Sequence, residues 1–146
     1  MKENWDKAIN FVIEWEKYWS SNPDDPGGLT IWGINSRDWP EEVAKMRKMA
    51  KSDALVYAKD FYKKEYWDKC GCDNLPQPMD IFIFDASVNC GVRNALKWWG
   101  EAKEPHIYLF RRLEYYVSLK SLFPTNGRGW VRRVLELRWY VESEQK

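Results

Sequence analysis

Histidine and paired cysteines are nearly absent from this sequence, which restricts the metal and redox chemistry available to it. His106 is the single histidine, and the three cysteines are Cys70, Cys72 and Cys90. Cys70 and Cys72 are too close for an unstrained disulfide, and no second cysteine pair or histidine cluster completes a zinc site. We therefore expect three free thiols in a reducing compartment, no metal site and no cofactor.

Long apolar runs are also missing. No stretch is long enough to span a bilayer, so we expect no stable membrane insertion. The first residues, Met-Lys-Glu-Asn-Trp-Asp-Lys, lack the apolar segment of a signal peptide. The sequence therefore predicts a protein that is made in a cytoplasm and needs separate help to reach any target outside the cell.

An excess of one charge is lacking as well, since 23 Lys and Arg stand against 22 Asp and Glu, for a net charge of +1. Phosphate binding usually needs a concentrated basic surface, so this balance argues against a nucleic-acid partner. The charge is uneven, because residues 106–146 hold eight basic and four acidic residues, a local +4. That part could meet an anionic polymer, although a solvated helix face explains the same charges.

Tryptophan is the residue type present in excess, with 10 Trp and 8 Tyr among 146 residues. Hydrophobic residues make up 45% of the chain, which is enough for one folded domain with a core. Ten tryptophans exceed what a core of this size needs, and aromatic faces stack on the apolar faces of sugars or bases. The composition favours a flat ligand such as a carbohydrate over core packing alone.

The first residues predict a helix over 4–19 that carries an acid on its apolar face. Apolar side chains recur at helical spacing, at Trp5, Ala8, Ile9, Val12, Trp15 and Trp19. At ~100° per residue, Glu16 falls within this stripe, whereas Glu14 points to the opposite side. We expect a half-buried Glu16, whose apolar neighbours favour the protonated carboxyl group, and a solvated Glu14.

A turn-rich loop and a short strand follow this helix. Residues 20–28 are rich in Ser, Asn, Pro, Asp and Gly, and the Asp-Pro-Gly-Gly segment that begins at Asp25 requires turn geometry with positive φ available. Residues 29–34 predict a short strand, half of a small hairpin. Glu16, Asp25 and Thr30 are therefore grouped around one glycine-rich loop.

The rest of the chain predicts helical scaffolding, with helices over 40–50, 53–67, 78–90, 92–100, 105–122 and 128–143. The segment 78–90 is apolar nearly all round, which predicts a central buried helix. Its polar exceptions, Asp85 and Asn89, lie four residues apart on one face. Because unpaired buried polar groups cost free energy, they either bond to neighbouring backbone or face a groove and bind substrate.

Two carboxyl groups and a hydroxyl in this order suit glycoside cleavage. The reaction needs a protonated acid for the leaving oxygen and a second carboxylate that activates water or stabilises charge. Glu16 suits the first role and Asp25 the second, and Thr30 could hold the attacking water. Such a water favours inverting chemistry, with carboxyl groups roughly 6.5–9.5 Å apart. The structural alternative is that Glu16 only ends a helix and that Asp24 and Asp25 cap a turn.

A resemblance to a known family covers most of the chain. Residues 16–34, whose core is the segment Asp-Pro-Gly-Gly-Leu-Thr-Ile-Trp-Gly-Ile over 25–34, resemble the signature of glycoside hydrolase family 108. The likeness continues through 61–67, 75–91 and 129–133. These are phage- and prophage-type N-acetylmuramidases, also called putative secretion activators. The resemblance implies hydrolysis of the β-1,4 bond between N-acetylmuramic acid and N-acetylglucosamine, and its catalytic glutamate falls on Glu16.

Together these points predict a mainly α, lysozyme-like α+β fold with a small β-hairpin after the first helix. One domain is expected over residues 1–146, with a catalytic part over 1–91 and a C-terminal helical part over 92–146. The resemblance implies that the C-terminal part is a peptidoglycan-binding region. We expect a monomeric, endolysin-like muramidase that is phage- or prophage-encoded and acts on bacterial peptidoglycan after release. Its substrate-binding residues are expected to be Tyr18, Trp32, Asp85 and Asn89.

Two other functions stay open at this point. Similar proteins usually place Gly-Gly directly after the catalytic glutamate, whereas Lys17 and Tyr18 stand here. This difference favours, as an alternative, a non-catalytic glycan-binding protein on the same scaffold. A helical protein that binds nucleic acid through its arginine-rich C-terminal helices is a third hypothesis, which the near-neutral net charge disfavours.

Overall fold

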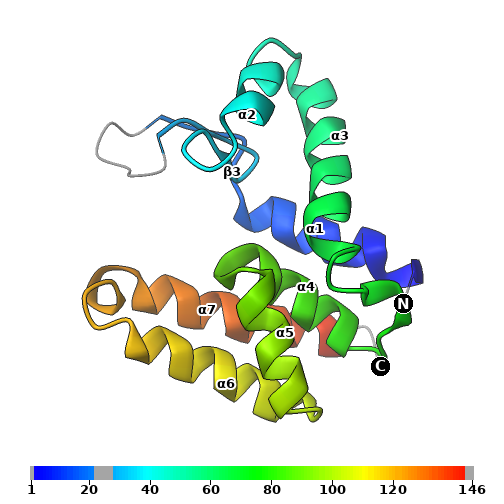
Figure 1. The fold of residues 1–146 in the computed structure, drawn as a ribbon, viewed down its shortest axis with the longest axis vertical. Coiled ribbons are helices and arrows are strands. Elements are labelled where there is room, and N and C mark those ends of the chain that lie inside the picture. The colour runs from blue at the N-terminus through cyan, green and yellow to red at the C-terminus, as the bar shows by residue number, and fades with distance from the viewer. Residues whose placement is uncertain (1, 22–27, 144–146) are drawn as a thin grey trace. The chain divides into compact units, whose positions relative to one another are not determined.

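The structure, a computed structural model, describes residues 2–21 and 28–143. The described chain is mainly helical with one small antiparallel sheet (Figure 1). The mainly α, lysozyme-like α+β class and the small hairpin after the first helix are therefore confirmed. The chain divides into two compact units, which we call the first unit (Asp6–Glu65) and the second unit (Met1–Trp5 with Tyr66–Lys146).

The first helix ends earlier than its apolar pattern predicts. A 3-10 turn, η1 (Lys2–Asn4), leads into α1 (Trp5–Trp15), and the buried residues of α1 are Ala8, Ile9, Phe11 and Val12. The prediction of helix as far as residue 19 is wrong, because the chain bends after Trp15 and enters strand β1 (Trp19–Ser20). Glu16 still donates to the Val12 carbonyl, whereas Trp19 pairs with Ile31 in the sheet.

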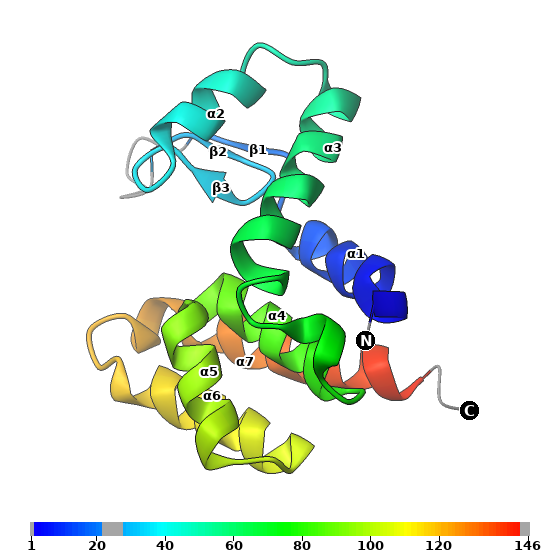
Figure 2. The same ribbon diagram turned by 45° about the vertical axis from the view of Figure 1, so that its right-hand side comes forward.

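The sheet of the first unit has three very short strands in the order β1, β2 (Thr30–Ile31) and β3 (Ile34–Asn35) (Figure 2). Trp19 pairs with Ile31 and Ile31 with Ile34, whereas Ser20 pairs with Thr30 and Thr30 with Asn35. Partners in register share a face of the sheet. One face therefore carries the buried Ile31 and Ile34, and the other carries a polar row of Ser20, Thr30 and Asn35.

Two helices complete the first unit. Helix α2 (Pro40–Met46) begins with a proline, and α3 (Lys51–Tyr62) continues into a π-helical turn, η2 (Lys63–Trp67). Trp39 packs edge-on against Phe61 with ring centres 4.8 Å apart, which joins the start of α2 to the end of α3. Helix α3 begins two residues before the predicted start at 53, and its N-cap residue, Ala50, makes no side-chain hydrogen bond.

The second unit is built around the predicted central helix, which is confirmed as α4 (Met79–Cys90), with every residue from 79 to 87 buried. A short 3-10 turn, η3 (Cys72–Asn74), precedes it. Trp5, Trp67 and Phe84 pack edge to face, with ring centres 5.4–5.5 Å apart. This aromatic cluster ties the first residues of the chain to α4.

Three more helices, α5 (Val92–Glu101), α6 (Pro105–Ser118) and α7 (Phe123–Glu142), surround α4 (Figure 1). Residues 123–127, which lie between two of the predicted helices, instead form the first turn of α7. Proline is tolerated there because its missing N–H would have no helical partner. Gly127 lies on the ring of Phe123, where an added Cβ would come within 2.6 Å of it, so this turn packs on itself.

No helix in the described ranges is both long enough and apolar enough to cross a membrane. None of Cys70, Cys72 and Cys90 forms a disulfide in the described part of the chain, and the first two are buried.

Candidate active site

The side chain of Glu16 is held against the tip of the β2–β3 hairpin. Glu16 directly follows α1, and its main-chain N–H donates to the Val12 carbonyl at 2.8 Å. It is half-buried and Glu14 is exposed, as the helical stripe predicted. A Cβ added at Gly33 would lie 2.7 Å from both Cβ and Cγ of Glu16. Residue 33 must therefore lack a side chain for the acid to lie where it does.

The turn that carries Gly33 has an unusual backbone. Trp32 and Gly33 both have positive φ, +48° and +81°, as a two-residue hairpin of type I′ requires. Tryptophan is rare in this region, and left-handed backbone at a non-glycine residue costs roughly 1–2 kcal/mol. Two hydrogen bonds hold the turn, from Trp32 N–H to the Tyr18 carbonyl and from the Tyr62 hydroxyl to the Trp32 carbonyl, each 2.9 Å.

Two aromatic side chains, Tyr18 and Trp32, form an aromatic group beside this turn. The rings of Tyr18 and Trp32 are 5.1 Å apart at their centres, and Lys51 Nζ lies 5.1 Å and 5.8 Å from the two ring centres. Trp19, the neighbour of Tyr18, is 43% exposed. The indole Nε1 of Trp32 is buried and has no hydrogen-bond partner among the residues that the structure describes. The structure thus brings Tyr18, Trp32 and, through Gly33, Glu16 together in the first unit.

The two other residues expected to take part in catalysis have different outcomes. Thr30 lies half-buried in β2, at the centre of the polar row between Ser20 and Asn35. Asp25 lies outside the described residues, so its partnership with Thr30 stays a prediction.

Sequence reasoning missed the residues that position Glu16. Tyr62 reads only as an apolar residue on the face of a helix, and its contact with Trp32 joins positions 30 residues apart. Gly33 follows Trp32 within a predicted strand, and only the pair of positive φ angles reveals a turn there. No signal in the local sequence indicates either contact, because both depend on how α3 and the hairpin meet.

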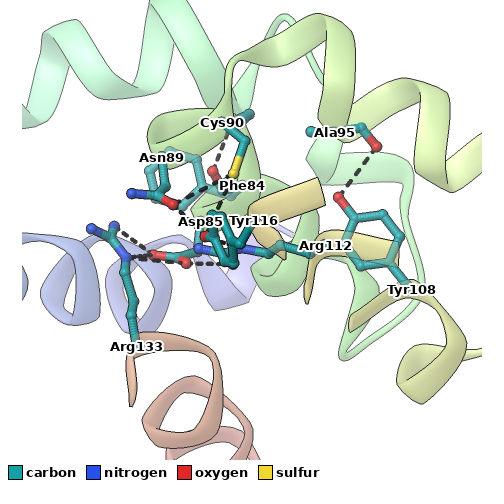
Figure 3. Close-up of polar contacts among 10 residues, drawn as sticks. Phe84, Asp85, Asn89, Cys90, Ala95, Tyr108, Arg112, Tyr116 and Arg133 are labelled. Atoms are coloured by element: carbon teal, nitrogen blue, oxygen red, sulfur yellow. Dashed lines mark hydrogen bonds and ion pairs between the residues drawn. The ribbon is translucent and has the colours of Figure 1, made fainter. Parts of the chain in front are cut away.

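Asp85, expected to contact substrate or neighbouring backbone, instead forms two ion pairs in the core of the second unit. Its carboxylate is 1% exposed. Arg133 donates to Oδ1 through Nη2 at 2.7 Å and Nε at 3.0 Å, and Arg112 Nη1 lies 2.7 Å from Oδ2 (Figure 3). Burial opposes ionisation, but the Arg133 and Arg112 guanidinium groups outweigh it and hold the pKa of Asp85 below its usual value. Both expectations for Asp85 are therefore corrected, and its role is to anchor α6 and α7 to α4.

Asn89, one helical turn after Asp85, remains half-buried at the end of α4. Its Oδ1 accepts a hydrogen bond from the Tyr116 hydroxyl, which in turn accepts one from Arg112 Nε at 2.8 Å (Figure 3). Asn89 therefore lies at the partly exposed end of the buried polar network that begins at Asp85.

One pocket in the second unit does not involve the expected site residues. This pocket of about 480 Å³ is lined mainly by apolar side chains, among them Phe82, Leu109 and Phe110, with Arg138 and Glu142 at its edge. Among the described residues, no three His, Cys, Asp or Glu side chains are grouped to hold a metal ion. The chemistry available at Glu16 is that of carboxyl, hydroxyl and aromatic groups.

Comparison with known proteins then assigns the chain to a family. Residues 9–91, more than half of the chain, match the family model described as glycosyl hydrolase 108. The chain belongs to glycosyl hydrolase family 108. The matched residues include Glu16, the Trp32–Gly33 turn and the whole of α4. Membership makes this family 108 protein a glycoside hydrolase of a peptidoglycan-degrading class.

A solved structure shares the fold beyond the matched residues. The structure titled "Structure of Brucella abortus SagA" has 25% sequence identity to this family 108 protein and a TM-score of 0.80. The alignment covers 98% of this chain and 96% of that one, so α5, α6 and α7 belong to the shared fold. A comparison with curated proteins finds no match.

Proposed function

We propose that this family 108 glycosyl hydrolase is an endolysin-like muramidase. It cleaves the β-1,4 bond between N-acetylmuramic acid and N-acetylglucosamine in bacterial peptidoglycan. The observation that carries the proposal is the placement of Glu16, a half-buried acid seated against Gly33 within the family match. A general acid must be held in a fixed position relative to the leaving oxygen, and close packing on a rigid turn supplies that restraint.

In the proposed mechanism Glu16 donates its proton to the leaving glycosidic oxygen. Asp25 accepts a proton from a water molecule that attacks the opposite face of the sugar ring, and the Thr30 hydroxyl orients that water. This arrangement inverts the configuration at the anomeric carbon. The short strands support the role of Thr30, because its pairing with both Ser20 and Asn35 fixes its backbone.

The aromatic group beside the turn supports a glycan substrate. Tyr18 and Trp32 lie next to each other on segments adjoining Glu16 and Gly33. Aromatic faces of this kind bind the apolar faces of sugar rings, so the proposal assigns Tyr18 and Trp32 to substrate binding. Asn89, in the second unit, is proposed separately as a contact with the glycan. The protein would act as a monomer on the wall after release from a phage- or prophage-bearing cell.

The decisive experiment compares Glu16→Gln with Glu14→Gln. Both substitutions remove one carboxylate near the end of α1, but Glu14 is exposed and serves as the matched control. Loss of a general acid is expected to lower the rate of peptidoglycan clearing by at least about 100-fold. Mass analysis of the released muropeptides identifies the bond, and NMR of the first-formed anomer reports inversion or retention. Equal clearing by wild type and Glu16→Gln would contradict the assignment.

A second candidate function is glycan binding without hydrolysis. The observation in its favour is that Tyr18, which stands where related proteins commonly have glycine, packs on Trp32 close behind the acid. Sedimentation with insoluble peptidoglycan, combined with an assay for newly released reducing ends, separates the two functions. Binding with no release of reducing ends would select this candidate over the muramidase.

A further inference from the structure

The amide of Asn89 has a fixed orientation, set by a chain of polar contacts through the second unit. The chain runs from Asp85 to Arg112, from Arg112 Nε to the Tyr116 hydroxyl at 2.8 Å, and from that hydroxyl to Asn89 (Figure 3). Arg112 is fully buried, and Tyr116 is 2% exposed. Tyr116 is itself held by stacking on Trp130, with ring centres 5.0 Å apart.

The donors and acceptors in this series of hydrogen bonds decide which amide atom of Asn89 bonds to the Tyr116 hydroxyl. An arginine side chain has donors only, so its Nε–H must donate to the oxygen of Tyr116. The single hydroxyl proton of Tyr116 then needs an acceptor, and that acceptor is the amide oxygen Oδ1 of Asn89. The Cys90 sulfur lies 3.4 Å from Oδ1 and 3.5 Å from the Tyr116 hydroxyl oxygen, so its single proton can donate to one or the other. The reversed amide would leave the tyrosine proton without a good acceptor, so the Oδ1 assignment follows from donor and acceptor types.

With Oδ1 accepting from Tyr116, the Nδ2 group is the part of Asn89 left to donate to a ligand. Figure 3 shows Nδ2 pointing away from Tyr116 and Cys90. No described residue accepts a hydrogen bond from it, and it is not among the buried polar atoms that lack a partner, so solvent reaches it. Asn89 therefore presents the two N–H donors of its amide to solvent.

The charge behind Asn89 also favours an oxygen acceptor. Asp85 carries one negative charge and is paired with both Arg112 and Arg133, which leaves the cluster with a net charge of +1. Nη2 of Arg112 is buried and has no hydrogen-bond partner among the described residues. A neutral or negatively charged oxygen next to Asn89 is therefore stabilised, whereas a donor group is disfavoured.

We propose that Asn89 is a specificity-determining residue whose Nδ2 group donates a hydrogen bond to an acceptor oxygen of the glycan. Tyr116 acts through Asn89 and is a positioning residue. Two groups of peptidoglycan supply such an oxygen, the acetamido carbonyl of either sugar and the lactyl carboxylate of N-acetylmuramic acid. The inference rests on the proposed function for its substrate class, and it is tested by binding rather than by hydrolysis.

The experiment measures dissociation constants by calorimetry for two probes. One is chitotetraose, which has acetamido groups only, and the other is the N-acetylglucosamine–N-acetylmuramic acid tetrasaccharide. Asn89→Ala and Asn89→Asp remove the donor, and the aspartate keeps an acceptor for Tyr116. Asn94→Ala is the matched control, because the amide of Asn94 already donates to the Cys90 carbonyl at 2.9 Å.

Asn89→Ala is expected to raise the dissociation constant about 2- to 10-fold if the acceptor is a neutral carbonyl, and more than about 10-fold if it is a carboxylate. Asn94→Ala is expected to keep the wild-type dissociation constant. Weakening with both probes identifies the acetamido group. If binding weakens for the muramyl probe alone, and weakens more in Asn89→Asp than in Asn89→Ala, the acceptor is the lactyl carboxylate. Tyr116→Phe combined with Asn89→Ala is expected to bind no more weakly than Asn89→Ala, whereas a merely structural role for Tyr116 gives additive effects.

Failure of this inference is distinguishable from failure of the proposed function. If the wild type binds and cleaves the glycan and Asn89→Ala has the same dissociation constant, the assignment of Asn89 is overturned and the muramidase stands. If the wild type binds neither probe, both are overturned.

Discussion

The side chain of Glu16 lies directly against the α-carbon of Gly33, close enough that a methyl group there would come within 2.7 Å of two Glu16 carbons. This contact joins the end of α1 to the tip of the β2–β3 hairpin. The position of the proposed general acid is therefore set by the hairpin as well as by its own helix. Four predictions follow from this relationship and from the polar network of the second unit.

Gly33→Ala is expected to displace Glu16 and lower the rate of peptidoglycan hydrolysis about 100-fold, because small misplacements of a catalytic group are costly. The Gly33→Ala variant should also be roughly 1–2 kcal/mol less stable, because alanine disfavours the φ of +81° at this position. Gly71→Ala is the control, since its φ is +64° but an added Cβ meets nothing within 4 Å. Thermal unfolding should show the backbone cost in both variants and an added steric cost in Gly33→Ala, where the new Cβ also meets the Tyr62 hydroxyl. Clearing assays should show a catalytic loss only at Gly33.

Tyr62→Phe removes the hydroxyl that donates to the Trp32 carbonyl at 2.9 Å. The loss should cost about 0.5–1.5 kcal/mol of stability and lower kcat, because the turn under Glu16 loses a restraint. Tyr108→Phe is matched, since that hydroxyl also donates to a backbone carbonyl, that of Ala95, at 3.2 Å. A fall in kcat of the same size in both variants would show that Tyr62 affects the fold and not the acid.

Trp32→Asn tests the indole ring while keeping the turn. Asparagine tolerates positive φ in a type I′ hairpin, so the unfolding temperature should stay the same or rise. Loss of the ring that packs on Tyr18 should raise KM several-fold with little change in kcat. Trp139→Asn, which replaces a 65% exposed tryptophan of the second unit, is expected to leave KM unchanged. An unchanged KM in Trp32→Asn would remove Trp32 from the substrate site.

Asp85→Asn should destabilise the protein by about 3–5 kcal/mol, because two buried guanidinium groups lose their counter-charge. The pKa of Asp85 is lowered on folding, so its contribution is present above the unfolded value of about 3.9 and is lost as pH falls through the folded pKa. As the pH falls over that range, the unfolding temperature should decrease in the wild type and in Asp60→Asn, a control at an exposed aspartate. Asp85→Asn should lack that component, and an identical pH profile would contradict the role of the ion pairs.

Much of the scaffold follows from local pattern alone. The central helix is predicted because its residues are apolar on every side, and Gly91, with φ of +87°, ends it where predicted. The errors lie at element ends, where two local preferences compete. Residues 16–19 suit a helix by periodicity, but the helix ends at Trp15 and Trp19 begins a strand. The segment that begins at Phe123 suits a loop by composition but forms the first turn of α7.

The sequence by itself determined the helical class, the amphipathic stripe that singles out Glu16 over Glu14, and the two polar positions in an otherwise apolar helix. Periodicity and burial cost are local properties, so they can be read along one segment. Only the tertiary structure decided that Gly33 supports Glu16, and that Asp85 pairs with Arg112 and Arg133. Those contacts join residues far apart in the chain, and their free energy depends on distances that exist only once the helices and the hairpin have packed.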